Sequence, residues 1–211
     1  MRKNSGFTLA EVLITLGIIG VVAALTMPTL MSSTQGAQYK AAYKKALSAL
    51  NQMVTLNVAL DDFNFAETPT GGTLTGTGYA TNMYGMIKAR MNVVKTSATT
   101  TGYAITEGGT AFTQNAANNY TMFFNDGIAF SFPVATGACV SGPTQAHSAY
   151  CKGFIDVNGA KAPNKIVTGD NCTTGSTNCV VTNPTDVYPV VFYDQTLLPN
   201  SEAARAVLYG K

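Results

Sequence analysis

The most constraining feature of this chain of 211 residues is a stretch, Val12 to Met31, that contains no charged residue. As a helix rising 1.5 Å per residue it is about 30 Å long, which matches the hydrocarbon core of a bilayer. Arg2 and Lys3 precede it, and basic residues mark the cytoplasmic side. The pattern predicts one membrane-spanning helix with a cytoplasmic N-terminus. A secretory signal peptide fits less well, because its apolar core is only about 7–15 residues long.

Glu11 lies at the start of the apolar stretch, where an ionised carboxylate is costly and usually functional. No Lys, Arg or His lies within reach on the same helix, so the carboxylate needs another partner. The alternative is a plain membrane anchor with an incidental Glu.

The sequence GFTLAE at residues 6–11, followed by the apolar run at 12–22, resembles the prepilin signal of type IV pilins and type II secretion pseudopilins. In that family a membrane-embedded aspartyl peptidase cuts after the glycine and N-methylates the new first residue. The resemblance implies cleavage between Gly6 and Phe7, methylation of Phe7, and retention of the apolar segment in the mature protein.

The same resemblance implies a role for Glu11. In assembled filaments of the family this carboxylate pairs with the N-terminal amine of a neighbouring subunit, and a buried charge is tolerated only when it is paired. Gly20 and Pro28 also occupy positions typical of the family. Because proline removes a helix donor, the helix is expected to kink there, and the resemblance suggests that it loosens between the two residues on assembly. An ordinary transmembrane kink is the alternative.

Beyond a polar bridge at 32–36, apolar residues recur at three- and four-residue steps from Tyr39 to Val58. One helix is therefore predicted from about Phe7 to about Leu60, bent near Pro28. The expected organisation is a cleaved leader at 1–6, a transmembrane and filament-core half at 7–31, and an extracytoplasmic head at 32–211.

The head gives its clearest signal at Asn125-Asp126-Gly127, which separates two aromatic runs and predicts a β-hairpin. The predicted class is α+β, with the long helix packed on an antiparallel sheet and a loop-rich, disulfide-tied C-terminal region; the pilin resemblance implies the same plan. The other predicted elements are a helix from Met83 to Val94, strands at about 150–157 and 188–193, a helix capped by Ser201 and running through Val207, and loops at 64–82 and 96–119.

Four cysteines lie in the C-terminal half, behind a segment that directs this part out of the cytoplasm, and this favours disulfides. Sequential pairing, Cys139–Cys151 and Cys172–Cys179, is preferred among three possibilities because short loops close easily. Four free thiols or a zinc site are the alternatives. Zinc is disfavoured because no CxxC pair exists and His147 is the only histidine.

One segment of the head has a pattern compatible with calcium. Asp156 and Asn158 place oxygen-bearing side chains at alternating positions before a glycine, and Asn164 and Asp170 are candidate further ligands. The full EF-hand pattern is absent. A turn in which Asp and Asn side chains bond their own backbone is the preferred interpretation, so no cofactor is expected except possible calcium.

Catalysis has little support in the sequence, which lacks GxSxG, HExxH, P-loop and GxGxxG motifs. A triad would need His147, and a Cys151–His147 pair would need a reduced cysteine. The adjacent Asp61 and Asp62 are interpreted as a solvated pair. We therefore expect no enzymatic activity, with a tethered periplasmic hydrolase as the alternative.

The resemblance implies a structural subunit of a type IV pilus or related pseudopilus. Such a subunit sits in the bacterial inner membrane by a single pass and then enters a periplasmic or cell-surface filament. The implied partners are further copies of the chain, prepilin peptidase, an inner-membrane assembly platform with its ATPase, and lipid. With a net charge of only +2, no nucleic-acid partner is expected. The alternatives are a type II secretion pseudopilin that drives protein export, a minor or tip pilin, and a membrane-anchored adhesin that does not form the bulk fibre.

Overall fold

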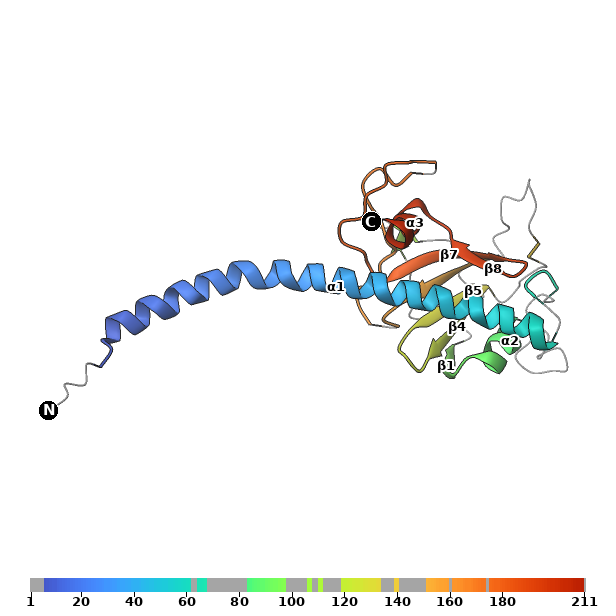
Figure 1. Ribbon diagram of the computed structural model, residues 1–211, viewed down its shortest axis with the longest axis horizontal. Helices are drawn as coiled ribbons and strands as arrows, with labels where there is room; N and C mark the ends of the chain where they lie inside the picture. The colour runs from blue at the N-terminus through green and yellow to red at the C-terminus, as the bar shows by residue number, and fades with distance from the viewer. Residues whose placement is uncertain are drawn as a thin grey trace.

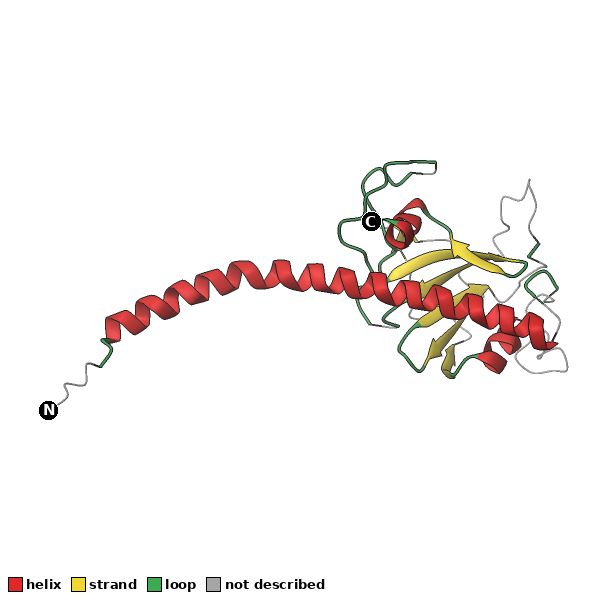
Figure 2. Ribbon diagram, in the orientation of Figure 1, coloured by secondary structure: helices red, strands yellow, loops and turns green. Residues whose placement is uncertain are grey.

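In the computed structural model, one long helix extends well beyond an α+β head (Figures 1 and 2). The structure describes residues 6–61, 64–67, 83–97, 106–107, 110–111, 119–133, 139–140, 151–159, 161–173 and 175–210. In chain order the elements are α1 (Leu9–Asp61), α2 (Met83–Arg90), β1 (Val93–Ser97), β2 (Thr106–Glu107), β3 (Thr110–Ala111), β4 (Asn119–Phe124), β5 (Ala129–Pro133), β6 (Lys152–Asp156), β7 (Val187–Tyr193), β8 (Thr196–Pro199) and α3 (Glu202–Tyr209). The predicted fold class is confirmed.

The long helix α1 agrees with the predicted Phe7–Leu60 helix to within two residues at each end. It runs without interruption through the polar bridge at 32–36 and past Pro28. Figure 1 shows it as a smooth curve over its N-terminal part. Proline therefore removes one backbone donor here without ending the helix.

The head first meets α1 at Gly36, which is buried whereas the residues before it are mostly exposed. A Cβ atom at Gly36 would lie 3.0 Å from Pro184 Cδ and 3.1 Å from Asn183 Oδ1, so the loop at 183–184 needs a glycine in order to approach this closely. We call Leu9–Gln35 the free half of α1 and Gly36–Asp61 the packed half.

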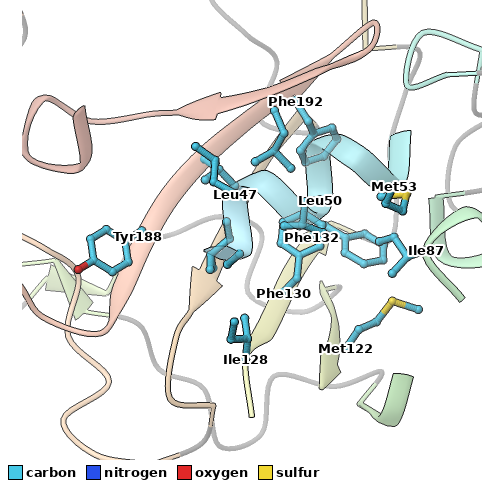
Figure 3. Packing of buried hydrophobic residues seen from close by; sticks show 14 of the residues in the cluster. Leu47, Leu50, Met53, Ile87, Met122, Ile128, Phe130, Phe132, Tyr188 and Phe192 are labelled. Carbon is cyan, nitrogen blue, oxygen red and sulfur yellow. The ribbon is translucent and has the colours of Figure 1, made fainter. Parts of the chain in front are cut away.

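The packed half buries one apolar stripe against the sheet. Buried residues recur at three- and four-residue steps, which places them on one face of a helix. Figure 3 shows Leu47 and Leu50 of this stripe near aromatic side chains of the sheet. The stripe consists of Tyr43, Ala46, Leu47, Leu50, Met53 and Val54. Each large side chain buried in this way stabilises the fold by about 1.5–3 kcal/mol.

The stacked rings of Tyr43 and Tyr188 join α1 to β7, with ring centroids 3.9 Å apart and planes 8° from parallel. Both residues are fully buried. Loss of hydration raises the pKa of both hydroxyls, and neighbouring ionisable groups, which include Asp186 beside Tyr188, raise it further. Both rings therefore remain neutral over the physiological range.

The sheet has six strands in the order β1-β4-β5-β6-β7-β8, and each neighbouring pair is antiparallel. The predicted hairpin is β4–β5, in which Met122 faces Phe130. Gly127 has φ +85° in its turn, a conformation that glycine adopts without strain. In this turn, Asp126 Oδ2 forms an ion pair with Lys45 Nζ of α1 at 2.8 Å.

Asn51 ties α1 to the edge strand β8. Its Oδ1 accepts a hydrogen bond from Leu197 N at 2.9 Å, and its Nδ2 donates to Leu197 O at 3.0 Å. One amide thus satisfies both backbone groups of a strand residue that has no further strand beside it in the sheet order. The helix thereby covers this point of the edge.

Two predictions for the region after residue 83 are wrong. Val94 was expected at the end of a helix, but α2 ends at Arg90, and Val94 lies in β1. Residues 96–119 were expected to be a loop, but they include the end of β1 and the paired strands β2 and β3. The spacing of Met83 and Met86 correctly predicted the helix α2, in which both side chains are buried. The β-branched Val93 and Val94 favour a strand, and β4 offers an edge that β1 pairs with.

Both sequential disulfides are formed, as predicted. Cys139–Cys151 is buried in the core, whereas Cys172–Cys179 closes a more exposed loop. The strands predicted at 150–157 and 188–193 correspond to β6 and β7. Ser201 caps α3 by accepting a 3.0 Å hydrogen bond from Ala204 N, which confirms the predicted cap.

Candidate functional site

The N-terminus of α1 is the candidate functional site. Residues 6–8 are not helical, and the helix begins at Leu9. The bond between Gly6 and Phe7 therefore lies in non-helical chain, two residues before the first helical position. Phe7 is 90% exposed, so a protease could reach this bond from solvent or from the membrane surface.

Thr8 and Glu11 close the start of α1 through reciprocal hydrogen bonds. Glu11 Oε2 accepts from Thr8 N at 2.8 Å and from Thr8 Oγ1 at 2.9 Å. In return, Glu11 N donates to Thr8 Oγ1 at 3.3 Å. This is a capping box, in which two backbone donors of the first helical turn receive side-chain acceptors. Glu11 thus has a partner inside its own chain.

Phe7 and Val12 extend this arrangement on the apolar side. They occupy the positions just before the cap and at the fourth helical residue, which are the two positions of a hydrophobic staple. Both residues line the same surface hollow as Glu11 and Thr15. The Phe7 side chain and the Glu11 carboxylate are therefore neighbours on one side of the helix start.

The free half of α1 has no packing partner in the described part of the chain. Its most apolar 18-residue window has a mean hydropathy of 2.3 and is wholly exposed, and the helix is long and apolar enough to cross a membrane. Its large apolar side chains are exposed, and Ile14, Ile19 and Leu25, for example, are each more than half exposed.

Several hydroxyl groups in the free half donate hydrogen bonds to backbone oxygens of the same helix. Thr15 Oγ1 donates to Glu11 O at 2.9 Å, and Thr26 Oγ1 donates to Val22 O at 2.9 Å. Near the end of this half, Thr34 Oγ1 makes the same kind of bond to Leu30 O at 2.8 Å. Internal hydrogen bonds are what a lipid environment requires of polar groups.

Residues 1–27 match a family model described as the prokaryotic N-terminal methylation motif. This motif is the signal of type IV pilins and pseudopilins. The N-terminal segment of the chain therefore carries the type IV pilin signal motif. The match includes residues 1–8, the capping box and much of the free half of α1, and it leaves the head outside. No curated protein and no solved structure matches the chain significantly.

The pilin motif coincides with the local structure of the site. It implies processing by prepilin peptidase and assembly into filaments in general, and together with the apolar helix it is consistent with anchoring in a membrane. Gly6, Phe7 and Glu11 lie together at the helix start, whereas Gly20 and Pro28 lie further along the exposed surface of α1. A Cβ atom added at Gly20 would meet nothing within 4 Å, so the subunit alone gives no packing reason for this glycine.

Thr8 is a residue of the candidate site to which the sequence prediction gave no role. The signal was present, because Thr followed three residues later by Glu before an apolar run is the pattern of a capping box. Glu11 was interpreted only through its charge. Its hydrogen-bonding role at the helix start was therefore missed.

The residues predicted to bind calcium are divided between two places. Asp156 ends β6, and Asn158 and Asn164 lie in the segment that follows this strand. Asp156 Oδ1 accepts a 3.0 Å hydrogen bond from Asn158 N, which is the kind of side-chain-to-backbone turn that the sequence favoured. Asp170 instead pairs its backbone with Val180, on either side of the loop that the second disulfide closes.

The residues considered for catalysis do not form a described site. His147 and Asp62 lie outside the described residues, and only the backbone of Asp61 is described, at the end of α1. The sulfur of Cys151 is bonded to Cys139, so in this structure it is not a thiolate nucleophile.

Proposed function

We propose that this chain is a structural subunit of a type IV pilus or a related pseudopilus. It would be inserted in the bacterial inner membrane, cut between Gly6 and Phe7, and assembled with copies of itself into a helical filament. The observation that carries the proposal is the free half of α1, an exposed apolar helix whose N-terminus bears a cleavable methylation motif.

The physical argument concerns what can cover the free half. Before assembly, lipid covers an apolar helix of this length without leaving a polar group unsatisfied. After extraction from the membrane, the same surface must be covered by other apolar helices, and copies of this chain supply them. Head-to-tail packing of identical helices generates an open helical filament when the rotation between copies does not close into a ring.

Glu11 would then exchange one partner for another. In the separate subunit its carboxylate accepts hydrogen bonds from Thr8. Cleavage creates an ammonium group on Phe7, and in the filament the amine of a neighbouring copy would pair with Glu11. The ammonium group adds the attraction of an opposite charge, which the Thr8 donors lack and which is strong in a dry filament interior, so the exchange favours assembly and fixes the axial register between copies.

The head gives the proposal its extracytoplasmic part. Two disulfides belong in an oxidising compartment, which agrees with a head outside the cytoplasm. The proposed role is mechanical rather than catalytic, and the assembly platform and its ATPase would supply the work. A pseudopilin that drives protein export is the second candidate, because the methylation motif serves both classes.

The test is to shear filaments from cells that express the full chain and to measure the mass of the N-terminal peptide. We expect the chain in the sheared fraction, beginning with N-methylated Phe7. The Gly6→Val variant should keep residues 1–6 and be absent from the sheared fraction. The control variant Gly17→Ala should still be cleaved, because a Cβ atom at Gly17 meets nothing within 4 Å. A bulk pilin would dominate sheared fibres and a minor pilin would be sparse. A chain found only in membranes, with residues 1–6 attached, would contradict the proposal.

A further inference from the structure

The six-stranded sheet of the head is open, and in the described part of the chain its two edges are β1 and β8. The outer side of an edge strand carries backbone N–H and C=O groups that have no partner in the sheet, so it can pair with a strand of another chain. Copies of one head that are brought close together can therefore join edge to edge. The structure of each edge decides whether they do.

The β8 edge is covered by the protein itself. Asn51 of α1 bonds both backbone groups of Leu197, which is fully buried. The strand is only four residues long and ends at Pro199, which has no N–H group to donate. A strand of another chain cannot lie against Leu197 unless α1 moves away.

The β1 edge has no comparable cover among the described residues, and it lies at the margin of the head (Figure 1). Val94, Lys95 and Thr96 are exposed, and the exposed fraction of Val94 is 69%. Val93, Val94 and Thr96 are β-branched, and such side chains favour strands. Apart from Lys95, this edge therefore has a composition that suits pairing with a further strand.

A β-bulge interrupts β1 at Val94. Val93 is opposite Phe124 of β4, and Lys95, two residues later, is opposite the adjacent residue Phe123. Val94 is therefore an extra residue without a position of its own in the ladder. A bulge bends its strand and increases the local twist, which makes the edge a poorer template for a further strand.

Lys95 places a positive charge at the centre of β1. The strand runs from Val93 to Ser97, so antiparallel pairing of the whole strand with the same strand of a second copy puts Lys95 directly opposite Lys95 of that copy. Side chains that face each other in this way have Cβ atoms about 4.5–5.5 Å apart, and like charges there are destabilising. Edge pairing of two copies would therefore bring two ammonium groups together.

The ring of Phe123 keeps this charge close to the sheet. Lys95 Nζ lies 5.8 Å from the centre of the Phe123 ring, which is within the range of a cation–π contact. Phe123 is half-buried and belongs to β4, the strand beside β1. The contact favours a position of the ammonium group beside the edge over a position extended into solvent.

We propose that the Val94 bulge and the Lys95 charge prevent the β1 edge from pairing with the β1 edge of a second copy. The sheets of neighbouring heads then stay separate, and copies of the chain associate through other surfaces. This inference does not depend on the proposed filament, because it applies wherever many copies are close together, as in a membrane. Loss of filaments and gain of edge pairing are separate outcomes.

The test uses the purified full-length protein in detergent, which covers the free half of α1. The main variant combines deletion of Val94 with Lys95→Val, and the deletion leaves Val93 and Lys95 opposite adjacent residues of β4 in a regular register. We expect a severalfold rise in the number of chains per particle, measured by light scattering, and slower hydrogen exchange of the β1 amides. Lys95→Val alone should have a smaller effect, because the bulge remains.

Reversal of the charge provides the matched control. The Val94 deletion combined with Lys95→Glu should not associate by itself, because Glu would face Glu. It should associate when it is mixed with the Val94 deletion that retains Lys95, because opposite charges then face each other. Thr96→Val, which adds an apolar side chain to β1 but retains Lys95, should behave as the wild type does.

Two results would overturn the proposal. The first is a wild-type number of chains per particle both in the combined variant and in Lys95→Val, which changes an exposed side chain and is expected to fold. Chemical denaturation of each variant verifies that the head is folded. The second is association of Thr96→Val, or of the Lys95→Glu variant by itself, to the same extent as the combined variant, because the charge would then not be what prevents pairing.

Discussion

The two halves of α1 belong to one continuous helix but have different surroundings. The packed half presents a stripe to the sheet, in which Leu50 is 1% exposed. The free half has no such stripe, and Leu16 is 60% exposed although it lies on the same helix. The difference shows that helical structure here does not depend on burial within the subunit. The free half is a surface prepared for lipid or for other copies.

Truncation of one leucine in each half of α1 should give the largest difference in the free energy of unfolding. Leu50→Ala should lower the free energy of unfolding of the head by about 2–5 kcal/mol, because it leaves a cavity between α1 and the sheet. Leu16→Ala, the matched control, should change it by less than about 0.5 kcal/mol, because Leu16 contacts no part of the head. Chemical denaturation of the full-length chain in detergent, followed by tyrosine fluorescence, measures both. Equal losses would show that the free half folds against the head.

Replacement of Asn51 tests how much the hydrogen bonds between α1 and β8 contribute to stability, apart from the apolar packing of the stripe. Asn51→Ala should cost about 1–3 kcal/mol, because Leu197 N and O would lose their partner at a half-buried position. Ser48→Ala, on the exposed face of the same half, is the control and should be nearly neutral. Hydrogen exchange of the Leu197 amide gives a local readout, and unchanged protection in Asn51→Ala would refute this role.

The smallest expected effect concerns pH and the buried tyrosine pair. Burial raises the pKa of the Tyr188 hydroxyl above its usual value of 10.0, so stability is fully present below pH 10 and declines as the pH rises above it. Tyr188→Phe should be neutral or slightly stabilising at pH 8, since the hydroxyl has no hydrogen-bond partner among the described residues. The variant should also lose less stability at pH 11. Tyr209→Phe, at a position 69% exposed, should follow the wild type at both pH values.

Local patterns explain what the sequence could predict. The apolar stretch, the Asp-Gly turn of the hairpin, the Ser201 cap and the short disulfide loops each depend on residues near one another in the chain. The closeness of Gly6, Phe7 and Glu11 at the start of α1 was predictable for the same reason. The buried stripe of the packed half was predictable because its apolar residues recur with the period of a helix.

Non-local pairing explains most of what was missed. The strand at Val93 exists because β4 offers an edge, and its own sequence gives only a pair of valines. The buried Asp186 carboxylate accepts hydrogen bonds from Asn164 N and Lys165 N, which lie 22 and 21 residues earlier in the chain. The same holds for Asn51, whose partner Leu197 is 146 residues away. Thr8 is different, because its signal was local and was overlooked.

The most direct test of the account is the filament yield of Glu11→Gln beside Glu11→Ala, with each variant quantified in the sheared fraction. Glutamine keeps a side-chain oxygen for the capping box but carries no charge. We predict that both variants lower the yield by roughly tenfold or more, because an unpaired amine buried in the filament costs about 3–5 kcal/mol. Head stability should be unchanged in both. A wild-type yield from Glu11→Gln would contradict the account, because capping alone would then suffice for assembly.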